Sequence, residues 1–410
     1  MSLLGIKLAL MIGQKIALPA PRVLIEALSS VEVTHNDQER SGFQLVFQVG
    51  RSGPRDIMDY KQLMNPMLLK AFNRVVIVIH FRLLPEVLMD GVITNIQLSP
   101  GDQPGSATLT VTGEDLSILM DRDNDKNSPW PSLGDDNIVR LIVAKYGQYG
   151  IVPLVSTPPS TNIDSPTRHV RVQQTSDLEY IKCLAARQGF VFYIEPGRLP
   201  NMSTAYWGKP VRTGQPQKAL SVNMGPDTNV ESINFDYNAL GPTLIVGKIQ
   251  DSETNKATAI RTAVSKRSPL TRQPALVANQ PNVRKSRLPV TREEARRQAE
   301  MSRTSGAQTG CCEASDISGL TQARATARAQ SIVDGSTDNV VTATGELNAV
   351  VYGTFLRAHG RVGLRGAGES YDGDYYVKSV THSIRKGEYK QRFTLTREGT
   401  GTLTPLVRPL

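Results

Sequence analysis

The sequence has little cysteine. It has 3 cysteines in 410 residues, at Cys183, Cys311 and Cys312. An odd number that includes an adjacent pair does not read as a disulfide framework, and this indicates folding in a reducing cytosol. We predict that Cys183 is a small buried residue of a helix. Cys311 and Cys312 lack the spacing of a redox or metal motif, so we assign them no chemical role.

Histidine is also scarce, and sequence motifs for catalysis are missing. No histidine lies at a metal-ligand spacing from another histidine or from a cysteine. The five histidines are His35, His80, His169, His359 and His382. The sequence contains no Walker loop, no G-x-S-x-G turn and no H-E-x-x-H motif. We therefore predict no enzyme activity and no catalytic, cofactor-binding or metal-binding residues.

Two acidic clusters lack the pattern of a calcium loop. They are Asp121–Asp125 and Asp372–Asp374, and no Glu follows Asp121 at the position that an EF-hand requires. We interpret both clusters as solvated turns. A carboxylate pair that meets only in the folded chain is not visible in a sequence, so glycoside hydrolysis stays open as an alternative.

Long apolar runs are missing as well. No segment reaches the roughly 18 apolar residues that a membrane helix needs. Residues 3–12 are apolar, and residues 17–20 loosely resemble a signal-peptide cleavage site. Lys7 interrupts the apolar run, and the pattern continues through Gln14 and Lys15, so we predict an opening β-strand rather than a signal peptide.

Positive charge is unevenly distributed. The net charge is +9, and residues 261–303 alone hold eleven Arg or Lys against three Glu. The rest of the chain is therefore close to neutral, which argues against a basic folded groove. The basic stretch has no aromatic residue for stacking on bases. We favour a linker, or an arm that docks on a protein neighbour, and keep a nucleic-acid-binding β protein as an alternative.

The clearest structural signal lies in residues 173–195. Ser176 followed by Glu179 is a capping box, which predicts a helix over residues 176–188. Apolar residues fall on one face of this helix, and Gly189 stands where a left-handed stop is expected. The next five residues, 190–194, are all β-branched or aromatic. We predict a helix that continues directly into a buried strand.

The remaining pattern predicts three modules in a mostly β, α+β chain. Residues 1–125 hold several short strands and form a first small β-barrel domain. Residues 126–225 form an α/β middle domain, with a second helix capped by Asp135 or Asp136. Residues 226–410 form a second β-barrel domain, with a basic flexible insertion at about 255–315 and a helix near 318–333. Within the insertion, residues 291–303 could form a short charged helix.

Two hairpins suggest that the barrels are related. Residues 90–98 and 107–115 close the first module, and residues 373–384 and 391–399 close the third. In each hairpin the second strand alternates threonine with apolar residues and ends in a charged turn that contains glycine. This similarity indicates two related barrels that flank a different middle module, although hairpin patterns recur in all β-rich chains.

Residues 173–193 also carry a family resemblance. They read Q-x-x-S-D-L-E-Y-I-x-x-L-A-x-x-x-G-F-x-F-Y, which resembles the signature of phage late control protein D and of the hub part of the valine-glycine repeat protein of type VI secretion. Short segments at residues 41–45, 205–208 and 373–397 also resemble this family. The resemblance covers most of residues 20–400, except 255–315.

The resemblance implies a structural baseplate hub of a contractile phage tail or injection system. It implies a homotrimer whose six barrels adapt a three-fold spike to a six-fold tube. After Thr396 only fourteen residues remain, so we expect a separate spike protein as partner, beside tail tube and baseplate proteins. We expect assembly in the cytoplasm and incorporation into the particle. A tail-associated cell-wall hydrolase is the alternative from another class.

Overall fold

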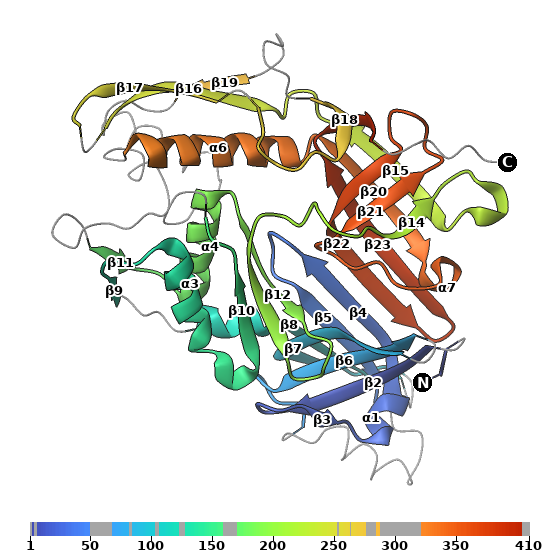
Figure 1. Cartoon of the computed structure of the whole chain (residues 1–410). Helices are drawn as coiled ribbons and strands as arrows, with labels where there is room; N and C mark the ends of the chain where they lie inside the picture. The colour runs from blue at the N-terminus through green and yellow to red at the C-terminus, as the bar shows by residue number, and fades with distance from the viewer. Residues whose placement is uncertain are drawn as a thin grey trace.

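One 14-stranded sheet runs through most of the protein (Figure 1). Its main strand order is β1-β2-β6-β7-β8-β5-β4-β22-β23-β20-β15. The computed structural model describes residues 2–3, 6–49, 68–81, 84–102, 106–122, 128–158, 170–251, 254–262, 264–275, 284–287 and 321–403.

The N-terminal part of the sheet alternates buried apolar residues with exposed polar ones, as β5 and β8 show clearly. Leu45, Phe47, Val75, Ile77 and Val111 are buried in its core. Its elements are β1 (Ser2–Leu3), β2 (Ile6–Gly13), β3 (Leu18–Pro19), α1 (Arg22–Ala27), β4 (Leu28–Asn36), β5 (Gly42–Gln48), β6 (Arg74–Phe81), β7 (Leu84–Ser99) and β8 (Thr108–Asp115). These strands confirm the predicted opening β-strand and the predicted hairpin pattern.

The C-terminal part continues the same sheet. Its elements are β14 (Gln217–Ser221), η3 (Gly225–Asp227), β15 (Val230–Tyr237), β20 (Val341–Asn348), α7 (Ala349–Tyr352), β21 (Arg361–Arg365), β22 (Gly373–Arg385), β23 (Glu388–Arg397) and β24 (Gly399–Thr402). Because β4, the last strand of the first unit, pairs antiparallel with β22, the two β units form one continuous sheet. The predicted mostly β, α+β class is confirmed. The described strands follow one open order, so the two units are parts of a single sheet rather than two separately closed barrels.

The two units repeat the same five-strand arrangement. The first pairs in the order β6-β7-β8-β5-β4, and the second pairs in the order β21-β22-β23-β20-β15. The hairpin β7–β8 shifts register between Ile93 and Asn95, and β22–β23 shifts between Val377 and Ser379. A β-bulge is a local feature of one strand position, so its recurrence aligns the two units residue by residue.

A second bulge and an ion pair support the same alignment. The strands β4–β5 shift register after Leu28, and β15–β20 shift after Val230. Both pairs of bulges align only when β4 corresponds to β15 and β7 to β22. Arg74 and Asp90 then correspond to Arg361 and Asp374, and each of these pairs is ionic, with N–O distances of 2.6 and 3.6 Å. The relationship suggested by the two hairpins thus extends to five strands.

The middle module packs beside the sheet. Its elements are η1 (Leu116–Asp121), β9 (Ser128–Trp130), α3 (Asp135–Ala144), η2 (Gly147–Tyr149), β10 (Ile151–Val155), β11 (Arg171–Gln173), α4 (Asp177–Gln188), β12 (Val191–Pro196) and β13 (Ser203–Gly208). Its core contains Ile142, Ile181, Leu184 and the fully buried Trp207. The boundaries at residues 125 and 225 stay a prediction.

The predicted helix–strand unit is confirmed in detail. The Ser176 hydroxyl accepts a hydrogen bond from the Glu179 N–H at 3.3 Å, and α4 begins there. Gly189 ends α4 with a φ of 65°. A side chain at this position would be strained by that φ, and its Cβ would lie 2.9 Å from the Ser331 side chain. The cap of α3 is Gly134 instead of the predicted Asp135 or Asp136, which both lie in the first turn.

A separate layer forms within the predicted flexible insertion. The strands β16 (Thr243–Gln250), β17 (Ala257–Arg261) and β19 (Arg284–Arg287) form a small sheet, and β18 (Thr271–Pro274) pairs with β24. Helix α6 (Gln322–Asp338) lies under the small sheet, between it and α4 (Figure 1). We call β16, β17, β19 and α6 the arm.

The arm corrects part of the prediction. Residues 257–261 are a strand, because Ile245, Ile249 and Ile260 find an apolar partner in α6, about 70 residues later in the chain. Residues 271–274 are a strand because they pair with β24. Such a distant partner is invisible in a local pattern. The possible helix at 291–303 lies outside the described residues. No helix in the described ranges is long and apolar enough to span a membrane.

Candidate assembly site

The seam between β4 and β22 joins the two repeated units. Seven residue pairs connect residues 30–36 with residues 379–385. On the polar face of the sheet, the Thr34 and Thr381 hydroxyls form a hydrogen bond at 3.0 Å across the seam. This seam is a contact between the edge of one repeat and the outer side of the hairpin in the other.

Three buried histidines lie beneath the seam. The His35 Nε2 lies 2.9 Å from the Leu88 carbonyl, and the His382 Nδ1 lies 2.8 Å from the Tyr389 hydroxyl. The His359 ring stacks on Tyr193 of the middle module, with 3.6 Å between the ring centroids. Nothing in the spacing of these histidines along the chain predicts that the fold brings them together.

Burial keeps the three imidazoles neutral. It lowers the pKa of His35 to about 4 and is the main reason that the pKa of His359 falls to about 3, with the His35 charge as the second cause. It also lowers the pKa of His382 well below its usual value. A proton on any of them would be buried near the other two, so these rings are suited to packing and not to proton transfer near neutral pH.

Acid is therefore expected to weaken the fold at this seam. In the unfolded chain the histidines take up protons near pH 6.5, whereas His35 in the folded chain does so only near pH 4. Above about pH 6.5 the rings are neutral in both states, so they cost no stability. As the pH falls below this value the free energy of unfolding decreases, by about 2 kcal/mol for each histidine at about pH 5. Burial raises the pKa of Asp37 to about 6 and that of Glu195 as well, and both offset part of this loss.

Urea unfolding between about pH 7 and pH 5 measures this effect. The variant His382→Gln keeps a hydrogen-bonding group for Tyr389 but removes one titrating ring, so its stability should fall less steeply with acid. An equal slope in both proteins would contradict the assignment. The neighbouring charges that face the cluster, Glu86 and Arg357, form an ion pair with each other. They therefore do not change the expected direction of the pH effect.

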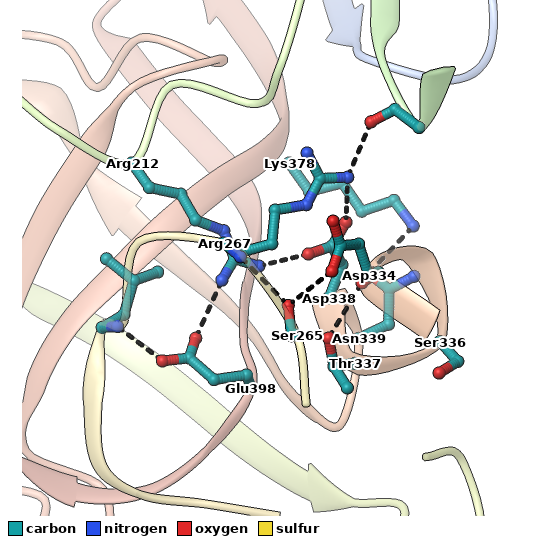
Figure 2. Close-up of polar contacts among 12 residues, drawn as sticks. Arg212, Ser265, Arg267, Asp334, Ser336, Thr337, Asp338, Asn339, Lys378 and Glu398 are labelled. Atoms are coloured by element: carbon teal, nitrogen blue, oxygen red, sulfur yellow. Dashed lines mark hydrogen bonds and ion pairs between the residues drawn. The ribbon is translucent and has the colours of Figure 1, made fainter. Parts of the chain in front are cut away.

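A buried ionic clamp ties the arm to the rest of the molecule (Figure 2). Arg212 donates to Glu398 at 2.9 Å and to Asp338 at 2.6 Å. Arg267 donates to the same Asp338 at 2.9 Å and to the Gly189 carbonyl at 2.8 Å. The clamp thus connects the end of α6, the end of β23 and the C-terminus of α4.

Further hydrogen bonds extend the clamp. Glu398 also accepts hydrogen bonds from the backbone N–H groups of Leu270 and Thr271. In the same region Asp334 accepts a hydrogen bond from the Ser265 hydroxyl (Figure 2). It also accepts one from the Lys266 N–H. Nearly every charge therefore has an opposite charge or a donor as partner. Such a network fixes the relative positions of the segments that it joins.

The open face of the sheet is polar. Threonines and serines recur at the outward positions of β8, β20, β22 and β23, and all of these side chains except the buried Thr396 are partly or fully exposed. A shallow groove on this face is lined by Ser232, Ile233, Asn234, Thr344, Gly345, Glu346, Ser379, Thr381, Arg392, Phe393 and Thr394. Glu346 pairs with Lys390 at 3.0 Å and with Arg392 at 3.1 Å, and these hydrogen bonds, Lys390 first, lower its pKa.

The residues singled out in the sequence have structural partners. Asp121 accepts from Ser176 at 2.7 Å, and Asp372 accepts from the Ala367 N–H at 2.8 Å. Neither is therefore a simple solvated turn residue. In the parts of the chain that the structure describes, no group of three or more His, Cys, Asp or Glu could hold a metal ion. His80 lies on β6, and His169 lies outside the described residues.

Cys183 differs from its prediction. It is buried in α4, as expected, but it is disulfide-bonded, whereas the number and spacing of the cysteines predicted no disulfide framework. The other two cysteines lie outside the described residues.

Comparison with known proteins identifies the fold. No protein-family model and no curated protein matches the sequence. Solved structures do match over nearly the whole chain. A tail protein from Neisseria meningitidis MC58 superposes with a TM-score of 0.61 at 10% identity, covering 97% of this chain and 98% of that one. The 43 kDa tail protein of prophage MuSo2 from Shewanella oneidensis gives 0.59 at 11% identity, covering 96% and 97%.

A chain of a PdpA–VgrG complex has the same fold. A chain of the Francisella PdpA–VgrG complex superposes with a TM-score of 0.54 at 9% identity, covering 99% of this chain and 60% of that one. The resemblance read from residues 173–193 is thus confirmed at the level of the fold. The protein has the fold shared by phage tail proteins and a chain of a VgrG complex.

Proposed function

We propose that the protein is a structural baseplate hub of a contractile tail or injection particle, with no catalytic role. The observation that carries this proposal is the duplicated five-strand framework in a chain with the fold of phage tail proteins. A trimer of a chain with two similar units presents six similar surfaces around one axis. Such a ring matches a three-fold spike on one side and a six-fold tube on the other.

The sheet gives the ring two different ends. The turns of β7–β8 and β22–β23 lie at the same end, because β4 and β22 run antiparallel across the seam. A trimer would show six similar hairpin turns there, so we assign this end to the tail tube. The middle module and β24 follow the opposite ends of β8 and β23, once per chain. We assign this three-fold end to a separate spike protein.

The mass in solution tests this proposal. We expect light scattering to give a trimer, alone or after addition of a spike or tube protein from the same particle. A charge change in the β22–β23 turn, such as Lys386→Glu, should weaken tube binding and leave spike binding unchanged. A monomer that ignores both partners would overturn the hub proposal. We further propose that assembly takes place in the cytoplasm, before incorporation into the particle.

A further inference from the structure

Two strand edges have no backbone partner among the described strands. β15 is the last strand of the main sheet order and pairs only with β20. On one side of β7, pairing with β6 ends at Val92, and backbone hydrogen bonds to residues 72 and 73 follow at Ile93. Among the described strands, residues 95–99 of β7 therefore pair only with β8, on the other side. Unpaired edges tend to pair with another strand, and natural proteins usually cover or blunt them.

The internal seam shows how these edges fit together. The repeat alignment makes β15 the equivalent of β4, and residues 95–101 the equivalent of residues 379–385. β4 and β22 pair with each other inside the chain, whereas their equivalents β15 and β7 do not. Each chain therefore has one complete seam and the two halves of a second one.

We propose that β15 of one copy pairs antiparallel with the outer side of β7 in a second copy, in the register of the internal seam. Residues 232–238 then lie opposite residues 95–101, with Asp236 facing Gln97 as Thr34 faces Thr381. This inference rests on the proposed hub, because it specifies how the copies of the ring join. The partner is a second copy of this chain.

The side chains of the two edges suit this register. Tyr237 is 44% exposed and Leu98 is 41% exposed, although both are large apolar residues. The proposed register places Leu98 opposite Phe235, next to Tyr237, where His382 and His35 lie in the internal seam. Burying these two residues removes apolar surface from water. Asp236 and Gln97 are a carboxylate and an amide, which form a hydrogen bond as the two threonines do.

The two edges of one chain do not meet. From β7 to β15 the sheet order runs β7-β8-β5-β4-β22-β23-β20-β15, which is seven strand steps. At about 4.8 Å for each step, the strands lie about 30 Å apart along the sheet. Any direct link between residues 97 and 236 is therefore between chains.

Cysteine cross-linking tests the register. The single variants Gln97→Cys and Asp236→Cys are co-expressed, so that neither chain can form the link alone, and the purified protein is oxidised. Directly opposite residues lie within disulfide range, whereas residues displaced by two positions do not. We expect about tenfold more covalent dimer from this pair than from Asp236→Cys with Asn95→Cys or Ser99→Cys. The variant Thr34→Cys/Thr381→Cys, at the same place in the internal seam, should form a link within one chain.

The mass in solution tests the hub proposal, and the position of the cross-link tests the register. A trimer in which 97 and 236 fail to link, or link no better than the displaced pairs, overturns the proposed register but keeps the hub proposal. A protein that stays monomeric and unlinked overturns both. A link to a tube or spike protein at residue 236, with none between chains, shows that another partner covers this edge and also overturns the inference.

Discussion

Replacing Glu398 with alanine is expected to lower the free energy of unfolding by about 3–5 kcal/mol. Glu398 is 5% exposed and Arg212 is 4% exposed, so water does not replace the lost carboxylate. Asp338 alone is then left to pair with the guanidinium groups of both Arg212 and Arg267. The same change also leaves the buried N–H groups of Leu270 and Thr271 without an acceptor. The loss should therefore be far larger than for an ordinary surface charge.

Urea unfolding of Glu398→Ala and Glu388→Ala measures this difference. Glu388 is the first residue of β23, the strand that ends just before Glu398, but it is exposed and forms an ion pair with Lys390 only at 3.7 Å. Its loss should cost less than about 1 kcal/mol. The variant Glu398→Gln keeps an acceptor and should fall between the two. Equal stability of the two alanine variants would show that the clamp contributes little to the fold.

The part of the fold that the sequence predicts best is local. Ser176, Glu179 and Gly189 are close in the chain, and the interactions that start and end α4 form within a few residues. The same holds for the β7–β8 and β22–β23 hairpins, whose alternating pattern reflects one buried face. These elements are where expectation and structure agree most closely.

The clamp could not be predicted in this way. Arg212 and Glu398 are 186 residues apart, and each is an ordinary charged residue in its local sequence. Their role comes from burial by β23 and α6, which no periodicity encodes. The same limit applies to the three histidines beneath the seam and to the arm, whose strands depend on a helix far along the chain.

The repeat was only partly predictable from the sequence. Similar hairpins were visible in the sequence, but the shared bulges at Ile93 and Val377 were not, because a bulge depends on the pairing partner. With the bulges in hand, the two units align by residue, and the internal seam becomes a template for a second one. The duplication is thus more informative about assembly than about the fold of one chain.

Replacing Leu98 with glutamate is expected to prevent ring formation without unfolding the chain. In the proposed seam Leu98 lies between Phe235 and Tyr237 of the next copy, so a glutamate there buries an unpaired charge. A cost of about 3 kcal/mol at each seam corresponds to about a 100-fold weaker contact, and a closed trimer has three such seams. In a single chain the same side chain is 41% exposed, so the stability of the monomer should change by less than about 0.5 kcal/mol.

Light scattering and thermal unfolding separate these two effects. Tyr237→Glu changes the facing edge and should give the same dissociated state, because it affects the same contact from the other copy. Leu199→Glu is the matched control: Leu199 is 64% exposed and lies in the connection between β12 and β13, so it belongs to neither edge and its trimer should remain intact. If Leu98→Glu remained a trimer while Leu199→Glu dissociated, the subunits would have to meet through the middle module instead of through the edges of the sheet.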